Sequence, residues 1–493
     1  MRFASHPGRY HKQMRTAPWL LMVLLLAPRA FGQSLPDLGG PGDVALSPQT
    51  ERRIGETIVR DIRRDPSYLD DPEIADYLGN LGARLTQVMT GARYDFEFFV
   101  IRDPTINAFA LPGGFVGVHT GLITSAETES ELASVLGHEI GHVTQRHIAR
   151  MFGQQQQMQM PLMVALAAAI LLGRSRPDLA SGAAAAAQAG AIQSQLNYSR
   201  DFEREADRVG LQALGAAGFD PRAMAVFFEK MQRSTRVSDD NAIPGYLRTH
   251  PVTFERIADA QNKAAALPYR QHLDTAEFQL VRAKLRADVG EARDAVAYFE
   301  TSLRDGRYAS KAAAQYGLAN ALLRARRPKD AEAVLARLRA ASTSGAMIET
   351  LAARLKQAQG DNLGAAALLG EARARFPYST PVLYAYVEAL QAADRNDEVL
   401  GALNEALRLH AHDVRLHSLR AKTYAALGRR LLQHQAQAEV YALQGSLPAA
   451  IEQVQLARSA GDGDFYQLSV VDARLKDLRT QHAIELRDQK RQP

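Results

Sequence analysis

The amino-acid sequence predicts a mainly α-helical protein: an α+β domain with a small β-sheet, followed by an all-α array of helix pairs. Three observations carry this prediction. Apolar residues of the first half follow helical spacing except around residues 96–119, where they alternate as in strands. From about residue 279, alanine, leucine and arginine dominate. The second half also repeats itself with a period of 34 residues, which is typical of solenoids.

Composition excludes several classes of protein. A chain of 493 residues with 46% hydrophobic and 23% charged residues is neither mainly disordered, nor collagen, nor a polytopic membrane protein. The absence of cysteine excludes disulfide scaffolds, zinc ribbons and thiol proteases. The first 32 residues hold five of the 59 basic residues and none of the 54 acidic ones, so the remainder is balanced at 54 of each. A neutral chain gives no electrostatic reason to expect a nucleic-acid partner.

The N-terminal segment has the anatomy of a secretory signal peptide. Residues 1–17 carry positive charge, residues 18–28 form a short apolar run, and Ala30-Phe31-Gly32 supplies small residues before Gln33. The alternative is a membrane anchor, but the apolar run has about half of the ~20 residues that span a bilayer. We therefore expect a signal peptide over 1–32 and export. A flexible Pro/Gly-rich linker is expected over 33–46.

Helices and then strands follow the linker. Ser47-Pro48 begins a predicted helix with isoleucines four residues apart, and a second helix is expected over Asp71–Leu85. Alternating apolar residues around 96–101 predict a first strand. A turn over Pro112–Gly114 separates two further predicted strands, at 107–111 and 115–119. A small sheet therefore precedes the next helix, which is expected to run from Glu127 to about Arg150.

That helix contains the segment His138-Glu139-Ile140-Gly141-His142. Histidines four residues apart lie about 40° apart around a helix, so both imidazoles can reach one cation. Zinc accepts imidazole nitrogen and prefers four ligands. Glu139 is placed beside them to take a proton from a water molecule that the metal polarises. With 13 histidines in the chain, roughly 0.02 such motifs are expected by chance.

A third metal ligand is required. His147 is nine residues after His138, so a continuous helix would turn it to the opposite face, and we expect a surface histidine there. Downstream, Glu203 and Asp207 lie four residues apart in the segment SRDFEREAD and share one helix face. One can bind the metal while the other holds a ligating histidine. The alternative is an ordinary charged helix face.

The segments HEIGH, SRDFEREAD and NAFALPGG together resemble secreted minigluzincin peptidases related to the CAAX prenyl proteases. The resemblance implies that one zinc ion per chain is bound by His138, His142 and Glu203. It implies that Glu139 is the general base and that Asp207 orients a zinc-bound histidine.

Two further site elements follow from the resemblance. The strand Asn107, Ala108, Phe109, Ala110 and Leu111 corresponds to an edge strand over the cleft, which would bind a substrate by β-augmentation. His250, in the segment LRTHP, matches a His-Pro element. It would either supply a fourth metal ligand, which closes such a site, or stabilise the oxyanion. The alternative is a histidine in a helix-capping loop.

Residues 151–196 combine a glutamine run at 154–157 with an apolar stretch at 161–172. The thirteen residues 161–173 are too few to span a bilayer. They predict either a helical hairpin packed on the catalytic domain or a mobile flap that touches the membrane surface or a partner.

The second half carries a tetratricopeptide pattern. Ala365-Leu369-Ala372 recurs 34 residues later as Val399-Leu403-Ala406, with earlier copies around Ala295 and Ala331. Stacked helix pairs form a concave surface of peptide size. The alternative is a non-repetitive helical domain.

The sequence therefore predicts a zinc metalloendopeptidase domain over 47–270 and a tetratricopeptide-repeat domain over 271–493. The resemblance implies that the protein acts in the periplasm, peripheral to the outer membrane. It implies unfolded or misassembled outer-membrane β-barrel proteins as substrates, with the β-barrel assembly machinery and the lipopolysaccharide-transport barrel as partners. The alternative is a chaperone or assembly scaffold whose zinc site is mostly latent.

Overall fold

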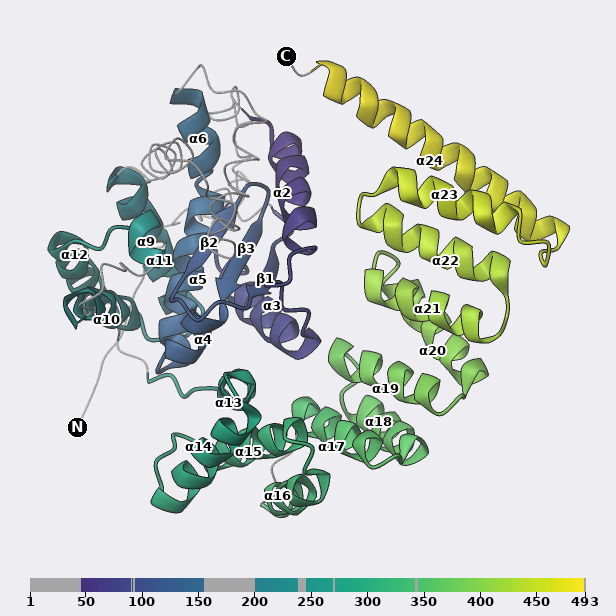
Figure 1. Cartoon of the computed structure of the whole chain (residues 1–493). Coiled ribbons are helices and arrows are strands. Elements are labelled where there is room, and N and C mark those ends of the chain that lie inside the picture. The colour runs from purple at the N-terminus through teal and green to yellow at the C-terminus, as the bar shows by residue number, and fades with distance from the viewer. Residues whose placement is uncertain are drawn as a thin grey trace, which may run out of the picture. The chain divides into compact units, whose positions relative to one another are not determined.

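The computed structural model describes residues 46–89, 91, 94–154, 200–237, 245–268, 271–341 and 345–491 (Figure 1). The predicted signal peptide, the linker up to residue 45 and most of segment 151–196 lie outside the described residues. Among the described helices, none has the length and apolar character that crossing a bilayer requires.

The first two helices begin where the sequence predicts. Helix α2 (Pro48–Ile62) is capped by Ser47, whose hydroxyl oxygen accepts from the backbone N–H of Thr50. Helix α3 (Pro72–Thr86) is capped by Asp71, whose carboxylate accepts from two N–H groups of the first turn. In both helices a proline follows the cap, where its missing N–H costs no helical hydrogen bond.

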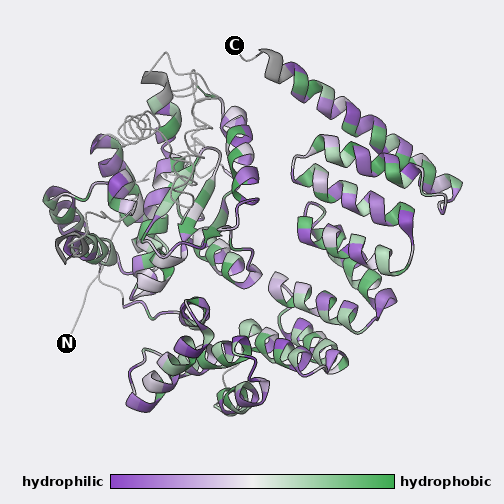
Figure 2. Ribbon diagram, viewed as in Figure 1, coloured by the Kyte–Doolittle hydropathy of each residue, from purple (hydrophilic) through white to green (hydrophobic). Residues whose placement is uncertain are grey.

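A three-stranded sheet follows, in the order β1-β3-β2. Strand β1 (Glu97–Ile101) pairs parallel with β3 (Phe115–His119), and β3 pairs antiparallel with β2 (Ala108–Leu111). The central strand β3 is buried along its whole length, and the strands are mostly green, that is hydrophobic, in Figure 2. The predicted sheet and its Pro112–Gly114 turn are therefore confirmed.

The long helix predicted from Glu127 to Arg150 is wrong at its C-terminal end. The chain forms α4 (Thr120–Ser125), then α5 (Glu129–Thr144), and a separate α6 (His147–Gln154). Between α5 and α6 the backbone of Arg146 is left-handed, with φ of 55°. The Arg146 side chain reaches Glu51 on α2, with 3.3 Å between Nε and Oε2, and its guanidinium also donates to the carbonyl of Leu46. This tertiary anchor stabilises a break that no glycine or proline marks in the sequence.

Four described helices complete the first half: α9 (Arg200–Ala216), α10 (Ala223–Val237), α11 (Gly245–Thr249) and α12 (Phe254–Ala265). Helix α9 packs along α5 at very short range. A Cβ on Gly210 of α9 would lie 2.9 Å from the carbonyl carbon of Gly137, and one on Gly141 of α5 would lie 3.1 Å from the carbonyl oxygen of Ala206. Glycine at these positions lets α9 approach α5.

The second half is helical throughout its described residues, which confirms the predicted fold class. Helices α17, α19 and α21 begin at 346, 380 and 414, each 34 residues after the previous one, as the sequence period predicts. The helices of this half are α13 (Ala276–Asp288), α14 (Ala292–Asp305), α15 (Lys311–Arg324), α16 (Pro328–Ala340), α17 (Ala346–Ala358), α18 (Asn362–Arg375), α19 (Thr380–Ala392), α20 (Asn396–Leu409), α21 (Val414–Ala426), α22 (Arg430–Leu443), α23 (Leu447–Arg458) and α24 (Phe465–Arg491).

The two halves share one hydrophobic core and a buried ion pair. The core runs from Leu69 to Leu355 and includes side chains of α3, the sheet, α5, α13, α15 and α17. Beside it, Nζ of Lys284 on α13 lies 2.6 Å from Oε2 of Glu73 and 2.5 Å from Oδ2 of Asp71. Thr350 of α17 also donates to Glu73. One carboxylate of α3 is thus neutralised and bound by helices of the second half.

Replacing Lys284 with methionine should therefore destabilise the protein. Removing one partner of a buried ion pair leaves the other charge uncompensated, which costs roughly 3–5 kcal/mol. The matched control is Lys263→Met, because Lys263 pairs with Asp259 at 2.6 Å on the surface, with both side chains about 40% exposed. That change should alter the free energy of unfolding by under about 0.5 kcal/mol. Urea denaturation of both variants checks this, and equal losses would contradict it.

Candidate metal centre

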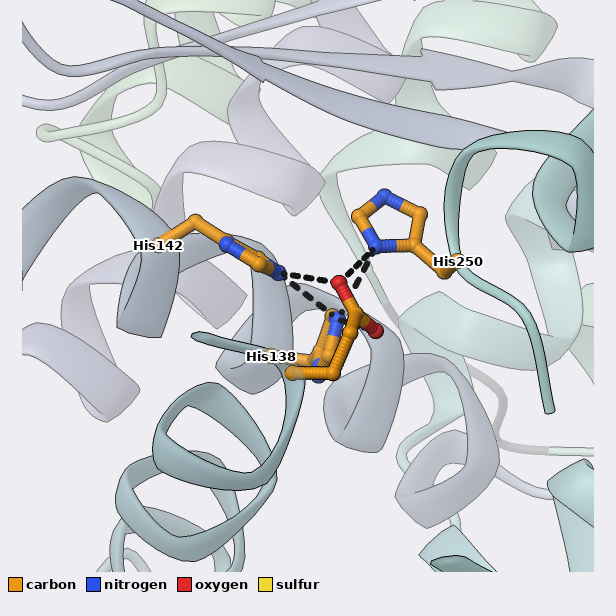
Figure 3. Close-up of side chains that lie close together, drawn as sticks. His138, His142 and His250 are labelled. Atoms are coloured by element: carbon orange, nitrogen blue, oxygen red, sulfur yellow. Dashed lines mark hydrogen bonds and ion pairs between the residues drawn. The ribbon is translucent and has the colours of Figure 1, made fainter. Parts of the chain in front are cut away.

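Helix α5 carries His138 and His142 on one face, and both side chains are buried. The closely packed α9 contributes Glu203, and the loop after α11 contributes His250. Figure 3 shows the three histidines directed towards one another. The metal-binding atoms of these four residues all lie within 4.8 Å of one another.

The distances within this cluster are short. Nε2 of His142 lies 3.0 Å from Nε2 of His138 and 3.3 Å from Oε1 of Glu203. Nε2 of His138 lies 3.5 Å from Oε2 of Glu203. Nδ1 of His250 lies 3.0 Å from Oε1 of Glu203 and 3.2 Å from Nε2 of His138. Three predicted ligands and the His-Pro histidine, which come from three segments of the chain, therefore meet at one point.

The donor set fits a metal ion. Imidazole nitrogens and one carboxylate, buried together, are the ligands that zinc takes in proteins. The charge states of His142 and Glu203 suit binding as well, because metal ligands must be deprotonated. Burial lowers the pKa of His142 well below its usual value. Burial alone would raise the pKa of Glu203, but the neighbouring His250 and His138 hold it well below its usual range.

Glu139 lies beside the cluster rather than in it. Its side chain is fully buried, and neither carboxylate oxygen has a hydrogen-bond partner among the described residues. The Nε2 atom of His250 lies 3.4 Å from Oε1 of Glu139. A buried carboxylate with free acceptor capacity next to a metal cluster can accept a proton from a bound molecule.

Asp207 faces the other ring nitrogen of a predicted ligand. Its Oδ1 lies 2.9 Å from Nδ1 of His138. Arg256 of α12 binds both oxygens of Asp207, each at 2.8 Å, and its Nη1 lies 2.7 Å from Oε2 of Glu203. Burial opposes the ionisation of Asp207, but Arg256 keeps its pKa below the usual value. Asp207 is thus placed to orient His138, as the resemblance implies.

Sequence reasoning missed Arg256 and Tyr246. The Tyr246 ring is fully buried and stacks on His250 with 4.9 Å between ring centroids. Both residues belong to the region after Glu203, and the His-Pro element is the sequence signal that could have drawn attention to it. Arg256 binds Asp207 from 49 residues away and the Tyr246 ring also contacts that of His138, about 110 residues earlier, and contacts at such separations are beyond the reach of helical periodicity.

The prediction that His147 is a surface histidine is wrong. Its side chain is fully buried, and its Nδ1 lies 2.8 Å from Nδ1 of His142. The prediction assumed a continuous helix, whereas the left-handed Arg146 turns the chain back towards His142. Burial lowers the pKa of His147 to about 4.

The predicted substrate strand lies at the edge of the sheet. Residues 108–111 form β2, which pairs with β3 on one side. Asn107 lies against Gly245 at the start of α11, and the carbonyl of Ile106 accepts from the N–H of Tyr246. The strand is thus near the segment that carries His250, and its role in substrate binding stays a prediction.

Fold and site together define a metallopeptidase with an HExxH helix and a helical-repeat half. Comparison with protein families agrees: residues 75–264 match peptidase family M48, and residues 357–423 match a tetratricopeptide-repeat family.

Individual relatives are similar over most of the chain. The beta-barrel assembly-enhancing protease of Escherichia coli (strain K12) is 32% identical over 93% of this chain and 96% of its own length. A putative beta-barrel assembly-enhancing protease of Vibrio cholerae is 34% identical over 65% of this chain and 67% of its own. The mitochondrial metalloendopeptidase OMA1 of Arabidopsis thaliana is 31% identical over 43% of this chain and 41% of its own. The chain therefore belongs to peptidase family M48, in the group of the beta-barrel assembly-enhancing proteases.

Proposed function

We propose that this metallopeptidase is a zinc-dependent endopeptidase of the periplasm, which degrades misassembled outer-membrane β-barrel proteins and assists the assembly of others. The observation that carries the proposal is the buried cluster of His138, His142 and Glu203 with Glu139 beside it. Nitrogen and oxygen donors of this kind favour zinc.

His138, His142 and Glu203 would hold the metal, which when bound polarises the scissile carbonyl and the attacking water. Glu139 takes the proton from that water and delivers it to the leaving nitrogen. Its buried carboxylate suits this task, because it has no hydrogen bond within the described residues that must break first. Asp207 and Arg256 hold His138 and Glu203 in place.

Metal removal tests the proposal. An unfolded β-barrel protein should be cleaved by the purified chain, cleavage should stop after chelation, and zinc should restore it. Glu203→Gln should weaken zinc binding more than Glu139→Gln, because only Glu203 belongs to the ligand cluster. Cleavage that persists in demonstrably metal-free protein would refute the proposal. Equal zinc affinity of Glu203→Gln and the wild type would remove Glu203 from the ligand set.

The substrate class and location rest on two supports. Relatives that cover nearly the whole chain are named for β-barrel assembly. The N-terminal 32 residues have the composition of an export signal. The β-barrel assembly machinery and the lipopolysaccharide-transport barrel are the partners we propose, with the repeat helices as the docking surface for such proteins.

Export predicts a defined N-terminus. Mass spectrometry of protein isolated from its natural host should find a chain that begins at Gln33, unmodified or cyclised to pyroglutamate. The reason is the small residues at the positions before the expected cleavage point, Ala30 and Gly32. A chain that retains Met1 in the membrane fraction would contradict cleavage.

A second candidate function is that of an assembly scaffold whose peptidase site is mostly latent. The observation that favours it is the position of His250, whose Nδ1 is a fourth donor in the cluster. Four protein ligands leave a zinc ion without an open position. If the Glu139→Gln variant supports barrel assembly in cells as well as wild type does, the scaffold function is separable from proteolysis.

A further inference from the structure

The two metal-site histidines of α5 are supported differently on the side away from the cluster. His138 faces a carboxylate directly, with 2.9 Å between its Nδ1 and Oδ1 of Asp207. His142 instead faces a second imidazole, with 2.8 Å between its Nδ1 and Nδ1 of His147. A carboxylate follows one step further, since Nε2 of His147 lies 3.1 Å from Oε2 of Glu205.

The chain of contacts fixes where the protons are. An ionised carboxylate only accepts hydrogen bonds, so Nε2 of His147 must donate to Glu205. In a neutral imidazole the other nitrogen then accepts, so Nδ1 of His147 receives the Nδ1–H of His142. That leaves Nε2 of His142 unprotonated, with its lone pair on the side of His138 and Glu203. A metal ligand needs this tautomer.

His147 is itself held firmly. Its ring stacks on Phe202 of α9, with 4.5 Å between centroids and 11° between ring planes. Arg150 contacts both Phe202 and Glu205. Its guanidinium lies 4.7 Å from the Phe202 centroid, and its Nη1 lies 2.7 Å from Oε2 of Glu205. Arg150 therefore neutralises Glu205 as Arg256 neutralises Asp207. The same order of groups, histidine to carboxylate to arginine, occurs behind both ligands, with one imidazole inserted behind His142.

We propose that His147 and Glu205 are positioning residues for the metal site. Nδ1 of His147 accepts the Nδ1–H of His142, and Nε2–H of His147 donates to Glu205, so that Nε2 of His142 is presented to the metal. This inference rests on the proposed metal binding by His142. Groups in this position typically contribute 10- to 100-fold to metal affinity.

Two substitutions of His147 separate this role from simple packing. The amide oxygen of asparagine can replace the Nδ1 of a histidine as acceptor, because both atoms are bonded to Cγ. Glutamine places its amide one bond further out, near Nε2, where it can reach Glu205 but not His142. His147→Asn should therefore keep zinc affinity within about threefold of wild type. His147→Gln should lower it about 10- to 100-fold.

The chain offers a matched control in His272. This largely buried histidine also bonds a carboxylate, with 3.0 Å between its Nε2 and Oε2 of Glu129, and lies against an aromatic ring, Phe219. It has no part in the metal cluster. His272→Asn should leave zinc affinity unchanged, whatever it does to stability.

The experiment measures the zinc dissociation constant of the full-length wild type and of the three variants by competition with a chromophoric chelator. The visible spectrum of the cobalt-loaded proteins and the melting temperature of the metal-free proteins are recorded alongside. The expected result is a weakened and spectrally altered site in His147→Gln alone. Equal zinc affinity of His147→Gln and wild type, or equal weakening in His147→Asn and His147→Gln, would overturn the proposal. A wild type that takes up no zinc would instead refute the metal assignment itself, and with it the positioning role of His147 and Glu205.

Discussion

Glu139→Gln should lower the rate at which this protein cleaves an unfolded β-barrel substrate by at least about 100-fold. General acid–base catalysis by one positioned side chain contributes typically 10²–10⁴-fold, and glutamine cannot take up the proton. The variant should still bind zinc, because Glu139 lies outside the ligand cluster. Substrate cleavage followed by gel electrophoresis, at equal zinc content, measures the effect.

The control for this experiment is Glu127→Gln. Glu127 lies just before the same helix, and its side chain is 74% exposed. Its loss should leave the cleavage rate within about twofold, since surface substitutions rarely change stability by more than ~0.5 kcal/mol. Full activity of Glu139→Gln at wild-type zinc content would show that another group acts as the base.

His250→Ala should raise proteolysis about tenfold, including cleavage of the protein by itself. Nδ1 of His250 lies 3.0 Å from Glu203 and 3.2 Å from His138, and as a fourth metal ligand it would take the open position that a substrate carbonyl or water needs. If the state closed by His250 is favoured by only ~1.4 kcal/mol, about nine-tenths of the molecules are closed and inactive at any time. Alanine at 250 removes the fourth donor and leaves the other three ligands in place.

The competing role for His250 gives the opposite result. If His250 stabilises the oxyanion, its loss should lower turnover about 10²- to 10³-fold. Casein cleavage by purified His250→Ala and wild type, at equal zinc content, separates the two roles. His272→Ala serves as the control for the general cost of removing a buried histidine, because His272 bonds Glu129 away from the cluster.

Local sequence rules predicted the elements that carry the site. The i, i+4 spacings of His138 with His142 and of Glu203 with Asp207 placed each pair on one face of a helix, and these helices are α5 and α9. Outside the site, Ser47-Pro48 marked the start of α2 in the same way. These features depend on residues a few positions apart, which periodicity describes.

The parts that sequence reasoning missed depend on tertiary contacts. Helix α5 ends at Thr144, the left-handed Arg146 that follows is bound by Glu51, about 95 residues earlier, and this break brings His147 behind His142. Arg256 reaches Asp207 from a separate helix. Neither partner follows from spacing along the chain.

The shared core has a consequence for how this protein unfolds. Glu73 of α3 receives Lys284 from α13 and Thr350 from α17, and apolar side chains from both halves fill one continuous interior. Cutting the chain near residue 270 would therefore expose an apolar face and strand a buried carboxylate, instead of releasing an independent enzyme. The catalytic half and the first repeats should melt in a single cooperative transition. The boundary between the metallopeptidase half and the repeats is thus not expected to separate two folding units.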